Sequence, residues 1–435
     1  MKQILSPLAR PVGLRILSLS ALILGLVGCA VNPVTGARQL SLVSAEQELA
    51  IGAQNYQPSQ QSQGGRYLVD PDLNVYVNEV TRRLAEISDR PGLPYEVVVL
   101  NNGTPNAWAL PGGKMAINRG LLVELEDEAQ LAAVMGHEIV HAAARHGASQ
   151  QTRGILMQSG MLVAGIAADQ TNSNYSSMAM GALSAGAGAW QAQYSRSHEL
   201  EADRYGIEYM ARAGYDPEAA VELQETFVKL SENRRSDWLN GLFASHPPSQ
   251  ERVEANRELA AQYSGGMRNK SVFERATRQL RRDQPAYDNY EAAQKAAANN
   301  ELDKAMALVG EAIKRQPREA LFWELQGRLL MEQGQEQQAL AVLNRAVETN
   351  PEFFRPLALR GLAHKRLGNF NEAQRDLEAS QAILPTQLAS FHLGELAEAR
   401  GDRQSAIRHY QQTVQGGGQL GQAAQERLQQ ISSGY

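Results

Sequence analysis

The chain has 435 residues, and 43% of them are hydrophobic, a proportion typical of folded globular proteins rather than disordered ones. This length exceeds what one ordinary hydrophobic core can serve, so we expect two domains behind any targeting segment. A net charge of −5 gives no reason to expect nucleic acid as a partner. The single cysteine excludes a disulfide framework and a cysteine-ligated metal, so any metal must be held by histidines and carboxylates.

The N-terminal segment 1–28 has the pattern of an export signal. A positively charged start precedes an apolar run at 16–27, which is shorter than the ~20 residues that span a bilayer. The run ends in Leu-Val-Gly-Cys29, which resembles the lipobox of bacterial lipoproteins, whose cysteine becomes the acylated first residue. We expect 1–28 to be a lipoprotein signal peptide and Cys29 to be the lipidation site. An ordinary signal peptide or an uncleaved anchor is the alternative.

The expected location is the envelope of a Gram-negative bacterium. Ala30 follows the cysteine, where an aspartate would resemble an inner-membrane retention signal. We therefore expect a periplasmic protein, lipid-anchored to the outer membrane. Residues 29–65 are predicted to be a polar tether with one short helix from Ser44 to Ala53, and 57–65 are predicted to be a flexible link.

The first folded domain is expected over residues 66–270. It begins with a predicted helix from Asp72, followed by strands at 95–100 and 114–118 that we expect to form a small antiparallel unit. Between them lies a third extended segment, which could pair with a substrate peptide by strand addition or be only a packed edge. Its residues are Trp108, Ala109 and Leu110.

The strongest motif is His137-Glu138-Ile-Val-His141, in a helix predicted from Glu128 to Arg145 with Asp127 as its cap. Positions i and i+4 lie about one turn apart on a helix, so both imidazoles can reach one ion. Glu138 then lies beside the open position of the metal. This arrangement suits a catalytic zinc whose bound water is activated by Glu138.

A third ligand is needed, and the sequence offers several. His146 lies about 140° further round the helix by spacing, so we expect it to point away. In a helix predicted from Gln193 to Ala213, Glu199 and Asp203 share one face, whereas His198 and Glu201 do not. One carboxylate can bind metal while the other orients a histidine. Between these helices, the apolar segment 154–190 is predicted to be a helical hairpin.

His246 is a further candidate, because it is fixed between Ser245 and two prolines. It could approach the metal as a fourth ligand in a resting state or donate to the tetrahedral oxyanion as a catalytic residue. Alternatively, it could be a solvated histidine in a loop that starts a helix.

The last third of the chain repeats. Proline recurs at equal intervals at positions 317, 351 and 385, and alanines and glycines recur in the same phase. The pattern resembles the tetratricopeptide repeat, which predicts an α-solenoid of about four repeats over 278–435, each of two helices with small residues where they cross. The segment 262–289 offers no clear flexible break, so the repeats are either a separable unit or packed against the first domain.

The His-Glu-x-x-His motif, followed later in the chain by Glu199-x-x-x-Asp203, resembles the gluzincin peptidases that include HtpX and the CAAX prenyl endopeptidase. The segment from Asn106 to Gly113 is also similar to that family. The resemblance implies a mainly α protein with a zincin-like α+β domain and a small β-sheet. It also implies Glu199 as the third ligand of one zinc ion per chain, with Asp203 behind the ligands. Long membrane spans of those peptidases are missing here, and the chain is closer to soluble periplasmic members with C-terminal repeats.

The expected function is that of an exported zinc endopeptidase acting on misfolded or stalled envelope proteins. Its partners would be polypeptide substrates and, through the repeats, the outer-membrane assembly machinery. The alternative is a periplasmic chaperone or adaptor for outer-membrane protein assembly in which proteolysis is occasional.

Overall fold

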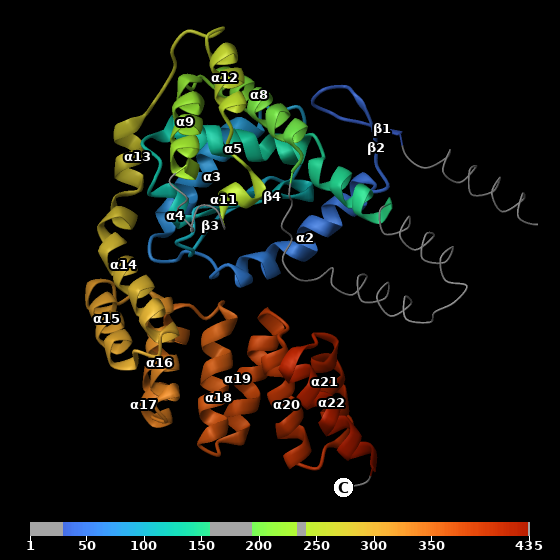
Figure 1. The fold of residues 1–435 in the computed structure, drawn as a ribbon, viewed down its shortest axis with the longest axis vertical. Helices are drawn as coiled ribbons and strands as arrows, with labels where there is room; N and C mark the ends of the chain where they lie inside the picture. Colours follow the sequence, from blue (N-terminus) through green and yellow to red (C-terminus); the bar gives the residue numbers. More distant parts are fainter. Residues whose placement is uncertain (1–28, 157–193, 233–240, 434–435) are drawn as a thin grey trace, which may run out of the picture.

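The computed structural model describes residues 29–156, 194–232 and 241–433. The predicted signal peptide and nearly all of the predicted hairpin at 154–190 lie outside these residues. Figure 1 shows an upper α+β part and, below it, a row of paired helices. The protein is mainly helical, with a small β-sheet in its first part and a C-terminal helical repeat array, as the sequence predicts. Within the described ranges, no helix is both long and apolar enough to cross a membrane.

The three-stranded sheet has the order β3-β5-β4. Strands β4 (Ala107–Leu110) and β5 (Lys114–Asn118) are antiparallel and joined by the short 3-10 turn η1 (Pro111–Gly113). Strand β3 (Glu96–Leu100) pairs with β5 in parallel, so the expectation of an antiparallel pair was wrong. The reason is the order of the strands. After β3 the chain forms β4 at the far edge of the sheet, and the tight turn η1 then returns it as β5 between β4 and β3, in the same direction as β3.

The segment expected to be a tether is instead folded onto the first domain. Strands β1 (Cys29–Val31) and β2 (Arg38–Leu40) form an antiparallel hairpin, and helix α2 extends over Ala45–Ser62. Gly52 packs so closely on the η1 turn that a Cβ there would overlap the carbonyl oxygen of Pro111. The prediction of a flexible link at 57–65 was therefore wrong, because α2 buries one face against the sheet region.

Helices cover the sheet and carry the rest of the first domain. Helix α3 (Pro71–Ala85) packs on β3 and on α5 (Glu128–Ala143), and α5 in turn packs on α8 (Arg196–Arg212). The remaining helices of this part are α4 (Arg119–Leu122), α9 (Glu218–Glu232), α11 (Leu242–Ser245), α12 (Gln250–Ala260) and α13 (Lys270–Ala276).

The C-terminal array consists of antiparallel helix pairs. Small residues lie where the helices of a pair cross, as predicted: a Cβ on Gly327 would lie 2.6 Å from the Leu343 side chain, and one on Gly394 would lie 2.7 Å from Tyr410. The helices are α14 (Arg278–Ala298), α15 (Leu302–Arg315), α16 (Ala320–Glu332), α17 (Glu336–Thr349), α18 (Phe354–Arg366), α19 (Phe370–Ile383), α20 (Gln387–Ala399), α21 (Arg403–Gln415) and α22 (Gly418–Ser433).

The first repeats share a hydrophobic core with the first domain. One continuous cluster of buried side chains extends from Tyr67 to Phe353. The guanidinium of Arg119 stacks over the ring of Tyr287 on α14, with 3.4 Å between its carbon and the ring centroid. Helix α2 lies between the sheet and the repeats in Figure 1, and the Gln61 amide donates to the carbonyl of Glu352 at 2.8 Å. Of the two arrangements left open by the sequence, the repeats are packed on the first domain.

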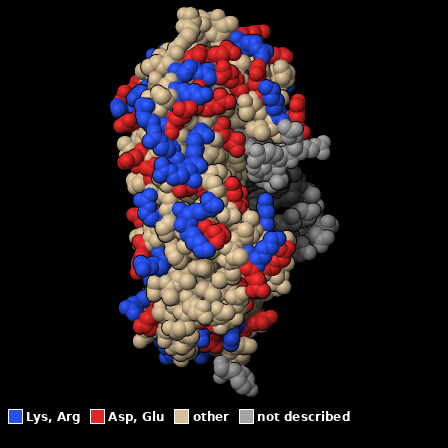
Figure 2. Space-filling view, turned by 90° about the vertical axis from the view of Figure 1, so that its left-hand side faces the viewer, with Lys and Arg blue, Asp and Glu red and all other residues tan. Residues whose placement is uncertain are grey.

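The face that carries α13 to α15 is turned toward the viewer in Figure 2. Basic and acidic side chains lie beside one another over this face, with uncharged residues between them.

Candidate metal centre

The two histidines of the motif lie one turn apart on α5, as predicted. Asp127 caps the helix by accepting a hydrogen bond from the backbone N–H of Gln130 at 2.9 Å. The helix ends at Ala143 rather than Arg145, because Arg145 adopts a left-handed backbone conformation with φ of 62°.

Helix α8 brings the candidate third ligand to the same point. It begins at Arg196, where the Ser195 hydroxyl accepts from the backbone N–H of His198 at 3.3 Å. Gly206 on α8 meets Gly136 on α5, and a Cβ on Gly206 would lie 3.1 Å from the backbone nitrogen of His137. The two helix backbones therefore approach as only glycines permit. This close crossing places Glu199 beside the histidines.

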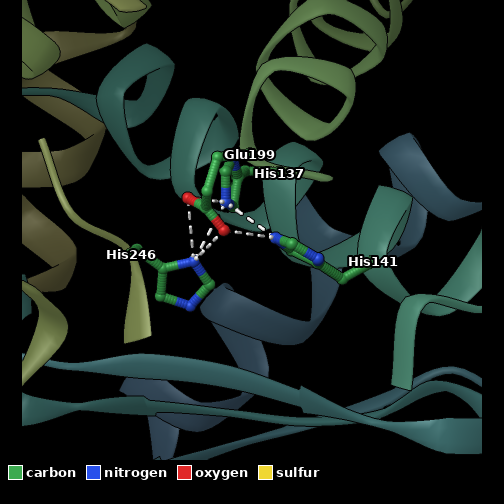
Figure 3. Close-up of side chains that lie close together, drawn as sticks. All are labelled: His137, His141, Glu199 and His246. Carbon is green, nitrogen blue, oxygen red and sulfur yellow. Dashed lines mark hydrogen bonds and ion pairs between the residues drawn. The ribbon is translucent and has the colours of Figure 1, made fainter. Parts of the chain in front are cut away.

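Four side chains converge at the crossing, as Figure 3 shows. His137, His141, Glu199 and His246 each offer a ligand atom, and these atoms all lie within 4.8 Å of one another. The Nε2 atoms of His137 and His141 are 3.0 Å apart, and the Glu199 oxygens lie 3.5 Å and 3.4 Å from them. His246 Nδ1 lies 3.1 Å from Glu199 Oε1. The candidate ligands named from the sequence are thus brought together with His246.

The chemistry of these donors fits a cation. Asp203 keeps a proton on His137 Nδ1, so in the neutral ring the Nε2 lone pair faces the Glu199 carboxylate. Two electron-rich atoms this close need a positive charge between them, either a proton or a metal ion. Nitrogen and carboxylate donors with no thiolate are a set that zinc accepts.

The ionisation of these groups in the metal-free cluster points the same way. Burial alone would lower the pKa of His137, but Glu199 and Asp203 outweigh it and raise that pKa to about 10. Burial likewise opposes ionisation of Glu199, yet His246 and His137 hold its pKa well below the usual range. The cluster therefore keeps a carboxylate charged and holds a positive charge beside it.

Asp203 lies behind His137. Its Oδ1 is 2.9 Å from His137 Nδ1, and both carboxylate oxygens accept from the buried guanidinium of Arg252, at 2.6 Å and 2.7 Å. Arg252 also lies 2.9 Å from Glu199 Oε2. Arg252 was missed by the sequence analysis. It is distant from Asp203 in the sequence, and an arginine in a helix after a His-Pro-Pro loop carries no local signal of this role.

Glu138 is buried beside the four-residue cluster. Burial raises the pKa of its carboxyl, and Oε2 has no hydrogen-bond partner among the described residues. Oε1 lies 3.4 Å from His246 Nε2. A carboxyl held this way, buried and incompletely hydrogen-bonded, is suited to accept and return a proton.

His146 is not among the four converging ligand residues, as expected, but its ring does not point away from His141. The helical periodicity that implied that direction stops at Arg145, and the chain then turns the buried His146 ring back toward His141. The two Nδ1 atoms are 2.9 Å apart. Glu201, expected to face elsewhere, lies 3.2 Å from His146 Nε2, and His198 stacks on the same ring with centroids 4.1 Å apart.

Strand β4 lies at the sheet edge next to the cluster. Ala109 and Leu110 are buried and Trp108 is partly exposed. Tyr194, whose ring stacks on His141 at 3.7 Å, donates its hydroxyl to the Ala109 carbonyl at 3.4 Å. A pocket lies beside the cluster. Its polar lining includes His137, Glu138 and His246, and its apolar lining includes Met210, Phe227 and Leu242.

Comparison with known proteins agrees with this geometry. Residues 71–260 match the model of peptidase family M48, and residues 290–352 and 359–420 match a tetratricopeptide repeat model. A provisionally named beta-barrel assembly-enhancing protease of Vibrio cholerae is 34% identical over 202 residues, which are 45% of this chain and 40% of that protein.

Two further relatives are similar over longer stretches. The mitochondrial metalloendopeptidase OMA1 of Schizosaccharomyces pombe is 30% identical over 229 residues, 52% of this chain and 65% of that protein. The beta-barrel assembly-enhancing protease of Escherichia coli K12 is 26% identical over 348 residues, covering 73% of this chain and 70% of that protein. The chain thus spans less than two thirds of the first two relatives. Residues 71–260 are thus a peptidase family M48 domain, and tetratricopeptide repeats follow that domain.

Proposed function

We propose that the protein is a zinc-dependent endopeptidase that binds one zinc ion per chain through His137, His141 and Glu199. The observation that carries this proposal is the convergence of these three side chains beside the buried carboxyl of Glu138. A zinc ion held there would polarise the scissile carbonyl and make a water molecule more acidic.

The chain's own residues then move the protons. Glu138 accepts a proton as the water oxygen bonds to the carbonyl carbon, and it returns that proton to the leaving amine as the C–N bond breaks. Asp203 holds His137 with its Nε2 toward the ligand cluster, and Arg252 holds Asp203. The apolar wall of Met210, Phe227 and Leu242 would receive an uncharged substrate side chain.

The metal assignment predicts the zinc content of variants. Purified protein should carry about one zinc per chain, and His137→Ala, His141→Ala and Glu199→Ala should each lose it, because three protein ligands hold a catalytic zinc. Atomic absorption on the purified proteins measures this, with the remote His409→Ala as the matched control. Full zinc retention in Glu199→Ala would contradict the ligand set.

The substrates we propose are misfolded or stalled envelope proteins. The Trp108–Leu110 edge of β4 would pair with the extended substrate, and Tyr194 would have to give up its bond to Ala109 for that pairing. The repeats would dock a substrate or the outer-membrane assembly machinery. The names of the bacterial relatives, which refer to β-barrel assembly, support this choice.

Attachment to the outer membrane through acylated Cys29 is part of the same proposal. Cys29→Ala should release the protein into the soluble periplasmic fraction. Several acyl chains hold a lipoprotein firmly in the membrane, whereas a protein without acyl chains has only weak contacts with it. Fractionation of cells followed by immunoblotting measures this. If the variant stays with the membrane, the folded part of the chain holds it there.

His246 is proposed to be a resting-state ligand that competes with water for the metal. His246→Ala should therefore raise basal casein hydrolysis while zinc stays bound, since the other donors remain. The sequence left open the opposite role, donation to the oxyanion, for which the same change lowers the rate. Equal rates in His246→Ala, His409→Ala and wild type would exclude both roles.

A further inference from the structure

The N-terminal segment reaches the back of the metal cluster through Asn32. This buried residue follows β1, and its Nδ2 donates to Glu201 Oε1 on α8 at 2.6 Å, although the two residues are far apart in the sequence. Its Oδ1 accepts from the backbone N–H groups of Val34 and Thr35 at 2.9 Å and 3.2 Å. The two backbone donors fix which end of the amide is oxygen, so the nitrogen must face Glu201.

Glu201 and His146 continue the chain of hydrogen bonds to a ligand. A carboxylate only accepts, so His146 Nε2 must donate to Glu201 Oε1 across their 3.2 Å contact. In a neutral imidazole the other nitrogen then accepts, so His146 Nδ1 takes the Nδ1–H of His141 at 2.9 Å. The lone pair of His141 is thereby placed on Nε2, the atom that faces His137 and Glu199.

We propose that Asn32, Glu201 and His146 are positioning residues that hold His141 in the tautomer and orientation needed to bind the metal. His137 is backed directly by Asp203, and His141 is backed by Glu201 through His146. Each histidine of the motif thus has its own carboxylate, and the second reaches its histidine only because the chain turns at Arg145. This inference rests on the proposed zinc site.

The test is the zinc dissociation constant, measured by competition with a chromophoric chelator on the full chain. Removing the carboxylate behind a metal-binding histidine typically weakens metal binding about 10- to 100-fold. We expect a loss in that range for Glu201→Ala and His146→Phe, and a smaller loss for Asn32→Ala. Glu201→Gln keeps an accepting oxygen and should lose less than Glu201→Ala. The matched control is Glu208→Ala, also on α8, whose carboxylate pairs with Arg204 at the surface.

A second readout distinguishes positioning from general damage to the fold. In wild-type protein labelled with 15N-histidine, His141 should carry its proton on Nδ1, and Glu201→Ala and Glu201→Gln should shift this signal while that of His137 stays in place. Unchanged zinc affinity and an unchanged His141 signal in Glu201→Gln and Asn32→Ala would overturn the proposal. Wild-type protein that binds no zinc would instead overturn the proposed function.

Discussion

Glu138→Gln should abolish peptide hydrolysis while leaving the fold and the zinc content intact. The two side chains have nearly the same shape, and Glu138 is not among the converging ligand atoms, so the metal keeps its donors. The amide cannot accept the proton of the attacking water, which should lower kcat by about 10²- to 10⁴-fold. Casein digestion measures the loss, and Glu124→Gln, an exposed carboxylate before α5, is the matched control.

The same variant should not be less stable than wild type. Burial raises the pKa of Glu138, so in the metal-free protein the folded state keeps the carboxyl proton to a higher pH than the unfolded state does. This group's contribution to the free energy of unfolding is therefore fully present at low pH and is lost as the pH rises from the unfolded pKa through the folded pKa. Glutamine has no charge to bury, so metal-free Glu138→Gln should resist urea at neutral pH at least as well as wild type.

Glu138→Gln also separates the two functions that the sequence allows. If the protein acts as an endopeptidase, the variant should lose its cellular role because it lacks the proton acceptor. If the protein acts as a chaperone or adaptor through its repeats, the variant should keep that role. Normal turnover by the variant would contradict the proposed mechanism. Loss of turnover with an intact cellular role would favour the adaptor.

The helix that carries His137 and His141 was predictable because its information is local. The i, i+4 spacing in a helix brings His137 and His141 to one side whatever surrounds them, and the period of the C-terminal repeats likewise describes neighbours that contact each other. The N-terminal segment was not predictable in this way. Its Gln- and Ser-rich composition suggests a link, but α2 buries Gly52 against the turn at Pro111, which comes much later in the chain, and it also buries Ser59, Gln60 and Gln61.

The residues that the sequence did not predict are placed at the site by tertiary contacts. Arg252 bonds Asp203 and Asn32 bonds Glu201 from distant parts of the sequence, and each is unremarkable in its local surroundings. His146 was placed wrongly because helical spacing was extended through Arg145, where the positive φ ends the helix. The direction of the β3–β5 pair depends on where the chain crosses the sheet, which strand propensity does not encode.

Deleting residues 278–435 should destabilise the first domain rather than release an independent peptidase. Without α14, the Arg119 guanidinium loses the Tyr287 ring on which it stacks, and the carbonyls of Val123 and Leu125 lose the Arg281 side chain that bonds them at 3.0 Å and 2.6 Å. The buried side chains that the repeats cover would face water. We expect a lower melting temperature and loss of casein hydrolysis in the truncated protein.

A substitution tests the shared core without removing it. Phe353 is 1% exposed, belongs to the buried cluster of the first domain and packs near Gly65, so Phe353→Ala should cost about 3–5 kcal/mol of unfolding free energy. Phe370 in the same array is 48% exposed, and Phe370→Ala should change stability far less. Loss of casein hydrolysis can be used to monitor unfolding in urea. If the two domains are one cooperative unit, the midpoint should move to a lower urea concentration in Phe353→Ala but not in Phe370→Ala. If Phe353→Ala and the truncated chain 1–277 both lose casein hydrolysis at the same urea concentration as the wild type, the domains are separable and the repeats serve only as a docking surface.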